Sequence, residues 1–138
     1  MKFLHSVAAL LSLVVMPLAA HAADCSHPSG GPGMSSAQAS FQCAEQVRIQ
    51  DDQQLDGLYN KLLVTLRDDP RLHTHPREDL TAAHRAWLAY RNAECQFRIS
   101  LASGAPQWAQ VNHSQCLSNL TEARIKTLAD YLQQAQGE

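Results

Sequence analysis

The sequence lacks an excess of basic charge, and it lacks the short motifs that mark common hydrolases and phosphate-binding proteins. Its 138 residues include 11 Lys and Arg against 13 Asp and Glu, which argues against nucleic acid as a partner. Neither G-x-S-x-G, nor H-E-x-x-H, nor a glycine-rich phosphate loop is present. The adjacent carboxylates Asp51-Asp52 and Asp68-Asp69 suit helix ends, where they meet the helix dipole. We therefore expect a protein that is not an enzyme and that needs no cofactor.

The first 22 residues contain one short apolar run and match a secretory signal peptide. Lys2 supplies positive charge, residues 7–15 form an apolar core, and Ala20-His21-Ala22 offers small residues for cleavage. The run is shorter than the roughly 20 residues of a membrane-spanning helix, so stable membrane insertion is not expected. Asp24, directly before Cys25, fits poorly with a lipid-modified cysteine. We expect a signal peptide over residues 1–22 and one domain over 23–138, periplasmic or secreted after cleavage.

Cysteine is scarce, and its spacing argues against a zinc site. The four cysteines all follow the predicted cleavage site, and no C-x-x-C pair occurs among Cys25, Cys43, Cys95 and Cys116. An even number of cysteines in an exported chain predicts two disulfides, which would leave no thiol nucleophile. The count alone leaves three pairings open.

Apolar residues at steps of three and four predict helices, and no strand alternation or internal repeat is present. Ser35 or Ser36 can cap a first helical run through Val47. A second run over residues 51–66 has the strongest amphipathic pattern in the chain. The pattern leaves open whether these runs form one helix or two. Gly57 either permits a close helix contact or is merely tolerated.

Two further helices are predicted beyond a proline-containing loop. Pro76 suits the first helical position, with Thr74 or His75 as the cap, so a helix is expected over residues 77–101. A loop is then expected up to Asn112, which is predicted to cap the last helix.

The stretch Leu80–Cys95 is expected to organise the fold. Its bulkiest apolar groups and one just beyond it share one side of a helix, which predicts a core-facing stripe of Leu80, Ala83, Trp87, Tyr90 and Phe97. Trp87 is interpreted as a core residue, with a functional role as the alternative. Arg91 is interpreted as partly buried and paired with Asp52 or Asp56, with an exposed Arg91 as the alternative. Tyr59 is expected to pack against this group.

The disulfide pairing follows from the expected packing of the last two long helices. If these helices form an antiparallel hairpin, Cys95 and Cys116 stand at similar heights on facing sides. A disulfide needs Cα atoms within about 7 Å, so we predict Cys95–Cys116, which leaves Cys25 to pair with Cys43. The predicted fold is all-α: a small disulfide-stapled helical bundle with an antiparallel helix hairpin.

Several blocks of residues together resemble the LprI-type lysozyme-inhibitor family over nearly all of the chain after the predicted signal. These blocks are Cys43, Asp52-x-x-Leu55-Asp56-x-x-Tyr59, Ala86-Trp87-Leu88-x-Tyr90-Arg91-x-x-x-Cys95, Cys116-Leu117 and Thr121-x-x-Arg124-x-x-x-Leu128. Asp56 stands where the family usually has Asn. The resemblance implies a disulfide-bonded helical protein of the cell envelope, and lysozyme inhibition is attached to some members.

One loop is a candidate for contacting a lysozyme. A lysozyme cleft holds two catalytic carboxylates, which a basic or polar loop can approach. Between Pro70 and Pro76 the chain carries Arg71, His73 and His75. The first hypothesis, which the family resemblance implies, is an exported binding protein that blocks a peptidoglycan-cleaving enzyme such as a c-type lysozyme.

Two alternatives remain from the sequence. One is a periplasmic interaction module whose partner is another envelope protein. The other is a metal binder, which would require the imidazoles of His73, His75 and His84 to converge.

Overall fold

The computed structural model describes residues 25, 26, 28, 33–102 and 104–137, which form three long helices and one short one. Helix α1 spans Ser36–Thr65, α2 spans Pro76–Leu101, the 3-10 helix η1 spans Pro106–Trp108, and α3 spans Ala109–Gln136. The predicted all-α fold is confirmed. The predicted signal peptide, residues 1–22, lies outside the described residues. Within the described ranges, no helix combines the length and the apolar character needed to cross a membrane.

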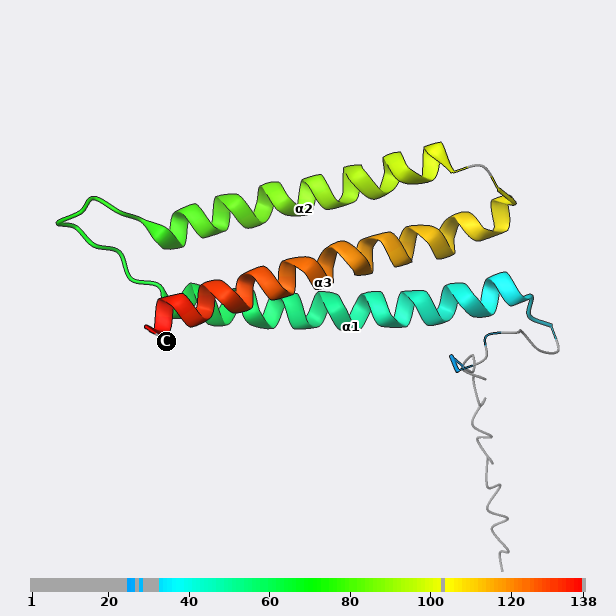
Figure 1. Ribbon diagram of the computed structural model, residues 1–138, viewed down its shortest axis with the longest axis horizontal. Coiled ribbons are helices and arrows are strands. Elements are labelled where there is room, and N and C mark those ends of the chain that lie inside the picture. The colour runs from blue at the N-terminus through cyan, green and yellow to red at the C-terminus, as the bar shows by residue number, and fades with distance from the viewer. Residues whose placement is uncertain (1–24, 27, 29–32, 103, 138) are drawn as a thin grey trace, which may run out of the picture.

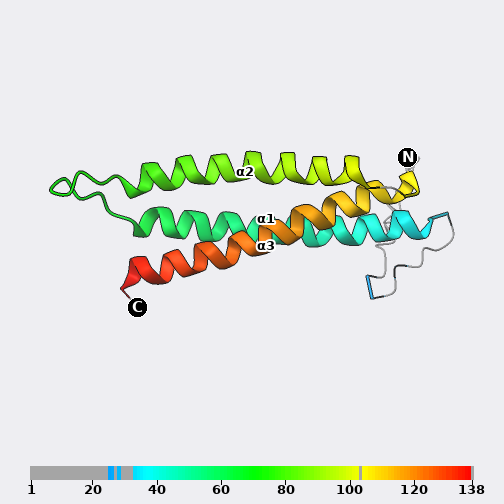
Figure 2. The same ribbon diagram turned by 45° about the horizontal axis from the view of Figure 1, so that its top comes forward.

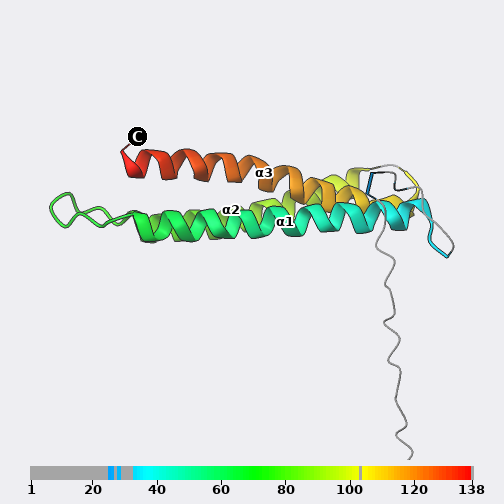
Figure 3. The ribbon, with the colours of Figure 1, turned by 90° about the horizontal axis from the view of Figure 1, so that it is seen from below.

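The long helices lie side by side in an elongated bundle. Helices α1 and α3 run in the same direction, and α2 runs in the opposite one (Figure 1). The expected antiparallel arrangement of α2 and α3 is present, but the most extensive packing joins α1 to α3. Figure 2 shows α3 crossing α1 obliquely, and in Figure 3 the last turns of α3 lie apart from the other two helices.

Helix α1 is one continuous helix, so the two predicted runs are joined. It begins after Ser35, whose hydroxyl accepts a hydrogen bond from the backbone N–H of Gln38 at 3.2 Å. A Cβ built on Gly57 would meet nothing within 4 Å, so this glycine does not permit a close helix contact. It is simply tolerated within a helix whose opposite face is well packed.

The predicted start of the last helix is wrong. Helix α3 begins at Ala109, and Asn112 lies within its first turns instead of capping it. Pro106 occupies the first position of η1, and this 3-10 turn runs directly into α3. The predicted start of α2 is close to the observed one, because Pro76 is its first residue. His75 holds the cap position without a side-chain cap bond.

The apolar core occupies the half of the bundle that contains the end of α1, the beginning of α2 and the end of α3. Its buried side chains come from all three long helices: Leu55, Leu62, Leu80, Ile125, Leu128 and Leu132. Burying a Leu side chain stabilises the fold by about 1.5–3 kcal/mol before entropy is counted, so this cluster is the main apolar contribution. Trp87 and Tyr59 are partly buried and pack against it, as predicted for a core Trp.

The predicted stripe on α2 is wrong in its second half. Tyr90 and Phe97 are 53% and 57% exposed. The side of α2 that faces the other helices carries Leu80, His84, Arg91 and Cys95 instead. Helical periodicity is compatible with either side of α2 as the interface. The side with Cys95 and Arg91 faces the bundle because Cys95 is bonded to Cys116 of α3 and Arg91 is paired with Asp52 of α1.

Both predicted disulfides are confirmed. Cys25 bonds to Cys43 with Cα atoms 5.4 Å apart, and Cys95 bonds to Cys116 with Cα atoms 5.7 Å apart. The second bridge ties α2 to α3 near the end of the bundle opposite the apolar core, so each half of α2 has its own attachment.

Candidate functional site

Arg91 joins the three long helices through a buried ion pair. Its side chain is 9% exposed, and Nη1 donates to Asp52 Oδ1 at 2.6 Å and to Thr121 Oγ1 at 2.8 Å. The predicted pairing of Arg91 with a carboxylate of α1 is therefore confirmed for Asp52, whereas Asp56 is exposed. The Thr121 hydroxyl donates in turn to the carbonyl of Leu117 at 2.8 Å, so it both accepts and donates at this junction.

A second arginine extends this network along α1. Arg48 Nη1 contacts the other oxygen of Asp52 at 2.5 Å, and Arg48 also forms two hydrogen bonds with the carboxylate of Glu45. Ser114 of α3 donates to Glu45 at 2.9 Å. The hydrogen bond from Arg48 is the main reason why the pKa of Glu45 is lowered, although burial opposes it.

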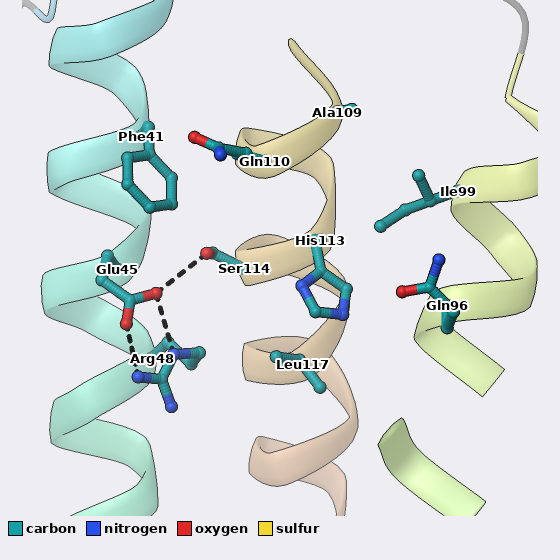
Figure 4. A pocket seen from close by; sticks show the side chains of 10 residues that line it. All are labelled: Phe41, Glu45, Arg48, Gln96, Ile99, Ala109, Gln110, His113, Ser114 and Leu117. Atoms are coloured by element: carbon teal, nitrogen blue, oxygen red, sulfur yellow. Dashed lines mark hydrogen bonds and ion pairs between the residues drawn. The ribbon is translucent and has the colours of Figure 1, made fainter. Parts of the chain in front are cut away.

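A groove of about 510 Å³ lies beside Glu45, and Figure 4 shows side chains of all three long helices around it. Both oxygens of Glu45 are engaged by Arg48 or Ser114, as the dashed lines in Figure 4 show. A carboxylate held in this way is poorly suited to act as a general base, because its lone pairs are already used. Arg48, Arg91, Asp52, Glu45 and Ser114, which we call the Arg48–Arg91 network, therefore serve to join the helices.

Next to Arg91, the buried side chain of His84 lies in a cluster of aromatic rings and guanidinium groups. The imidazole is 8% exposed and stacks on Tyr59 with ring centroids 4.2 Å apart. The guanidinium groups of Arg91 and Arg124 lie 5.3 and 5.7 Å from the ring centroid of Trp87. Burial lowers the pKa of His84, and Arg124 and Arg91 lower it further, while Asp56 opposes them.

The loop between α1 and α2 projects beyond the end of the bundle (Figures 1 and 3). Asp69 shapes its tip: Oδ1 accepts from the backbone N–H of Arg71 at 2.8 Å and of Leu72 at 3.4 Å. The backbones of Asp69 and Thr74 form an isolated β-bridge across the loop. His73 has a φ of 51°, a left-handed conformation that is uncommon outside glycine. We call residues 66–75 the projecting loop.

The projecting loop presents the predicted inhibitory residues to solvent. Arg71, His73 and His75 are all exposed, and His75 Nδ1 lies 3.8 Å from the Asp68 carboxylate. Sequence reasoning missed Leu72, which is 71% exposed at the tip. A single apolar residue between turn residues gives no periodic signal, so only its exposure in the fold marks it.

The three histidines of the metal hypothesis are not brought together. His73 and His75 are exposed in the projecting loop, whereas His84 is buried against Tyr59 within the bundle. Among the described residues, no group of three or more His, Cys, Asp or Glu side chains is placed to hold a metal ion.

Comparison with protein families gives a match over most of the chain. A family model described as lysozyme inhibitor LprI matches residues 31–128, which include the projecting loop, the Arg48–Arg91 network and the second disulfide. No curated protein and no solved structure matches the chain.

Proposed function

Since this chain belongs to the LprI lysozyme-inhibitor family, we propose that it binds a peptidoglycan-cleaving lysozyme and blocks its active-site cleft. The family match is the observation that carries this proposal. The amino-terminal signal pattern adds that residues 23–138 act outside the cytoplasm, in the periplasm or after secretion, where such an enzyme meets the cell wall.

The projecting loop is the surface that we assign to the lysozyme. It extends beyond the helices, so it can enter a cleft without a clash from the rest of the bundle (Figure 1). The cleft of a lysozyme contains two carboxylates, and Arg71 carries a permanent positive charge at the tip. His73 and His75 add two exposed polar side chains beside it.

Local hydrogen bonds favour tight binding by this loop. The carboxylate of Asp69 holds the tip, and the bridge to Thr74 closes its base. A loop that is already held in one conformation loses little entropy when it binds, so more of the contact energy appears as affinity. Leu72 supplies an apolar group that is 71% exposed and gains from burial against a partner.

The decisive experiment measures cell-wall turnover by a c-type lysozyme with and without the purified mature protein. We expect inhibition by the wild-type chain and by Arg85→Ala, an exposed change on α2 away from the loop. The double variant Arg71→Ala/Leu72→Ala should inhibit at least about tenfold less, with an unchanged melting temperature. Absence of inhibition by a micromolar excess of wild-type protein over several lysozymes would refute the function. Equal inhibition by the loop variant would refute only the assignment of the loop.

A second candidate function is an interaction module for another envelope protein. It is favoured by the exposed apolar side chains on one face of α2, where Tyr90, Phe97 and Leu101 are 53%, 57% and 67% exposed. Capture of an envelope protein that is lost on Phe97→Ser, together with no effect on any lysozyme, would favour this candidate over the first.

A further inference from the structure

A second groove opens at the end of the bundle that carries the projecting loop. Its volume is about 530 Å³, within the range of small-molecule pockets, and side chains of all three long helices line it. Its aliphatic lining comes from Leu62 of α1, from Leu66 directly after that helix, from Leu80 and Ala83 of α2, and from Ala135 of α3. We call it the distal groove.

Arg124 gives the distal groove a cation that forms no ion pair with any carboxylate of the described residues. Its side chain lines the groove, and its guanidinium lies over the ring of Trp87 at 5.7 Å. Its Nε is buried and has no hydrogen-bond acceptor among the described residues. The other two arginines of the bundle interior differ, because Arg48 and Arg91 each contact Asp52. A buried donor without an acceptor is uncommon and indicates a missing partner.

We propose that the distal groove binds a free fatty acid, with its carboxylate at the Arg124 guanidinium and its acyl chain along the aliphatic walls. The two observations fit the two halves of one ligand: a guanidinium without an ion pair among the described residues suits a carboxylate, and the leucine walls suit an alkyl chain. From Arg124 to Ala135 the groove follows α3 for about 16 Å, at 1.5 Å per residue, which is long enough for a chain of medium length.

Two further side chains define the selectivity of the distal groove. Asp79 also lines it, and its negative charge opposes the binding of an anion. Tyr131, which is 45% exposed, offers a ring for the acyl chain and a hydroxyl near solvent. Changes at Asp79 and Arg124 should therefore alter fatty-acid affinity in opposite directions.

The experiment measures binding of dodecanoate to the mature protein by titration calorimetry, below the concentration at which dodecanoate forms micelles. Dodecyl maltoside, which has the same chain and an uncharged head, is the matched ligand control. Arg124→Gln removes the cation, and Lys126→Gln removes the same charge from an exposed position two residues away. Ala83→Phe fills the groove from α2, and Asp79→Asn removes the opposing charge.

We expect saturable binding of one dodecanoate per chain, weakened at least about tenfold by Arg124→Gln and abolished by Ala83→Phe. Lys126→Gln should leave the affinity unchanged, Asp79→Asn should raise it, and dodecyl maltoside should bind far more weakly. In a Trp108→Phe background, dodecanoate should also change the emission of Trp87, because Arg124 lies over that ring.

Equal binding to Arg124→Gln and Lys126→Gln, or binding of dodecyl maltoside as tight as that of dodecanoate, would overturn the proposal. Absence of dodecanoate binding to the wild-type chain would also overturn it. If Arg124→Gln fails to fold, the Ala83→Phe and dodecyl maltoside results still decide the question. The lysozyme assay is independent of this titration, so failure of one leaves the other standing.

Discussion

Replacement of Arg91 by Met tests whether the buried ion pair holds α2 to the other helices. Methionine keeps much of the volume of the side chain but removes both donors to Asp52 and Thr121. Removing one partner of a buried ion pair costs about 3–5 kcal/mol. Asp52 is 29% exposed and keeps its contact with Arg48, so we expect a loss near the lower limit, about 3 kcal/mol.

The assay is thermal unfolding of the oxidised mature protein, followed by far-ultraviolet circular dichroism. For a domain of this size a loss of about 3 kcal/mol lowers the melting temperature by roughly 10–15 °C. Arg85→Met is the matched control, because Arg85 is exposed on the same helix and should change the melting temperature little. An Arg91→Met midpoint within about 2 °C of the wild type would refute the reasoning.

The pairwise part of this effect can be isolated with Asp52→Asn. If Arg91 acts mainly through Asp52, the double variant should be less destabilised than the sum of the two single variants, by about 2 kcal/mol. Strict additivity would show that Arg91 stabilises the fold through Trp87 or Thr121 instead.

Three further predictions concern other parts of the molecule. Burial, with Arg124 and Arg91, lowers the pKa of His84, so the unfolded chain takes up more protons than the folded one just below the ordinary value of 6.5. The contribution of His84 to the free energy of unfolding should therefore be fully present above pH 6.5 and should decrease as the pH falls toward the lowered pKa. When the free energy of unfolding is measured in urea between pH 7 and 5, His84→Phe should lack this decrease. Cys95→Ser/Cys116→Ser should lose about 3 kcal/mol of stability in the absence of reductant, and a wild-type midpoint would contradict the chain-entropy argument. Asp69→Ala should weaken lysozyme inhibition while leaving the melting temperature within about 2 °C, because its hydrogen bonds lie in an exposed loop; unchanged inhibition would show that the tip does not need to be held.

The disulfides and the Arg91 ion pair could be predicted because each of these groups has few possible partners in the sequence. Four cysteines allow three pairings, and the hairpin geometry selects one of them. Arg91 lies on the same side of α2 as Leu80 and Cys95, and Asp52 on the facing helix was one of the two carboxylates predicted to pair with it.

The exposed position of Tyr90 and Phe97 was not predictable from periodicity. Two neighbouring sides of α2 carry helical spacings, one richer in aromatic groups and one containing His84 and Arg91. Hydrophobicity favours the first, but the polar residues of the second find partners on α1 and α3 that the sequence of α2 does not reveal. Tertiary pairing therefore overrides the apolar pattern.

The candidate site was only partly visible in the sequence. Arg71, His73 and His75 indicate a basic loop, but its rigidity depends on the Asp69 carboxylate and on the left-handed backbone of His73. The distal groove has no sequence signature at all. It depends on which side chains of the three long helices meet at this end of the bundle, and the sequence of one helix does not reveal that.

The parallel pairing of α1 with α3 determines how much of the chain must be present before it can fold. Contacts such as that between Glu45 and Ser114 join residues 69 positions apart, so the first helix waits for the last one to be made. A chain that stops before α3 leaves Leu55 and Leu62 without the cover of Leu128 and exposes them to other unfinished chains. Nearly the whole polypeptide must therefore be present before these leucines of α1 are covered.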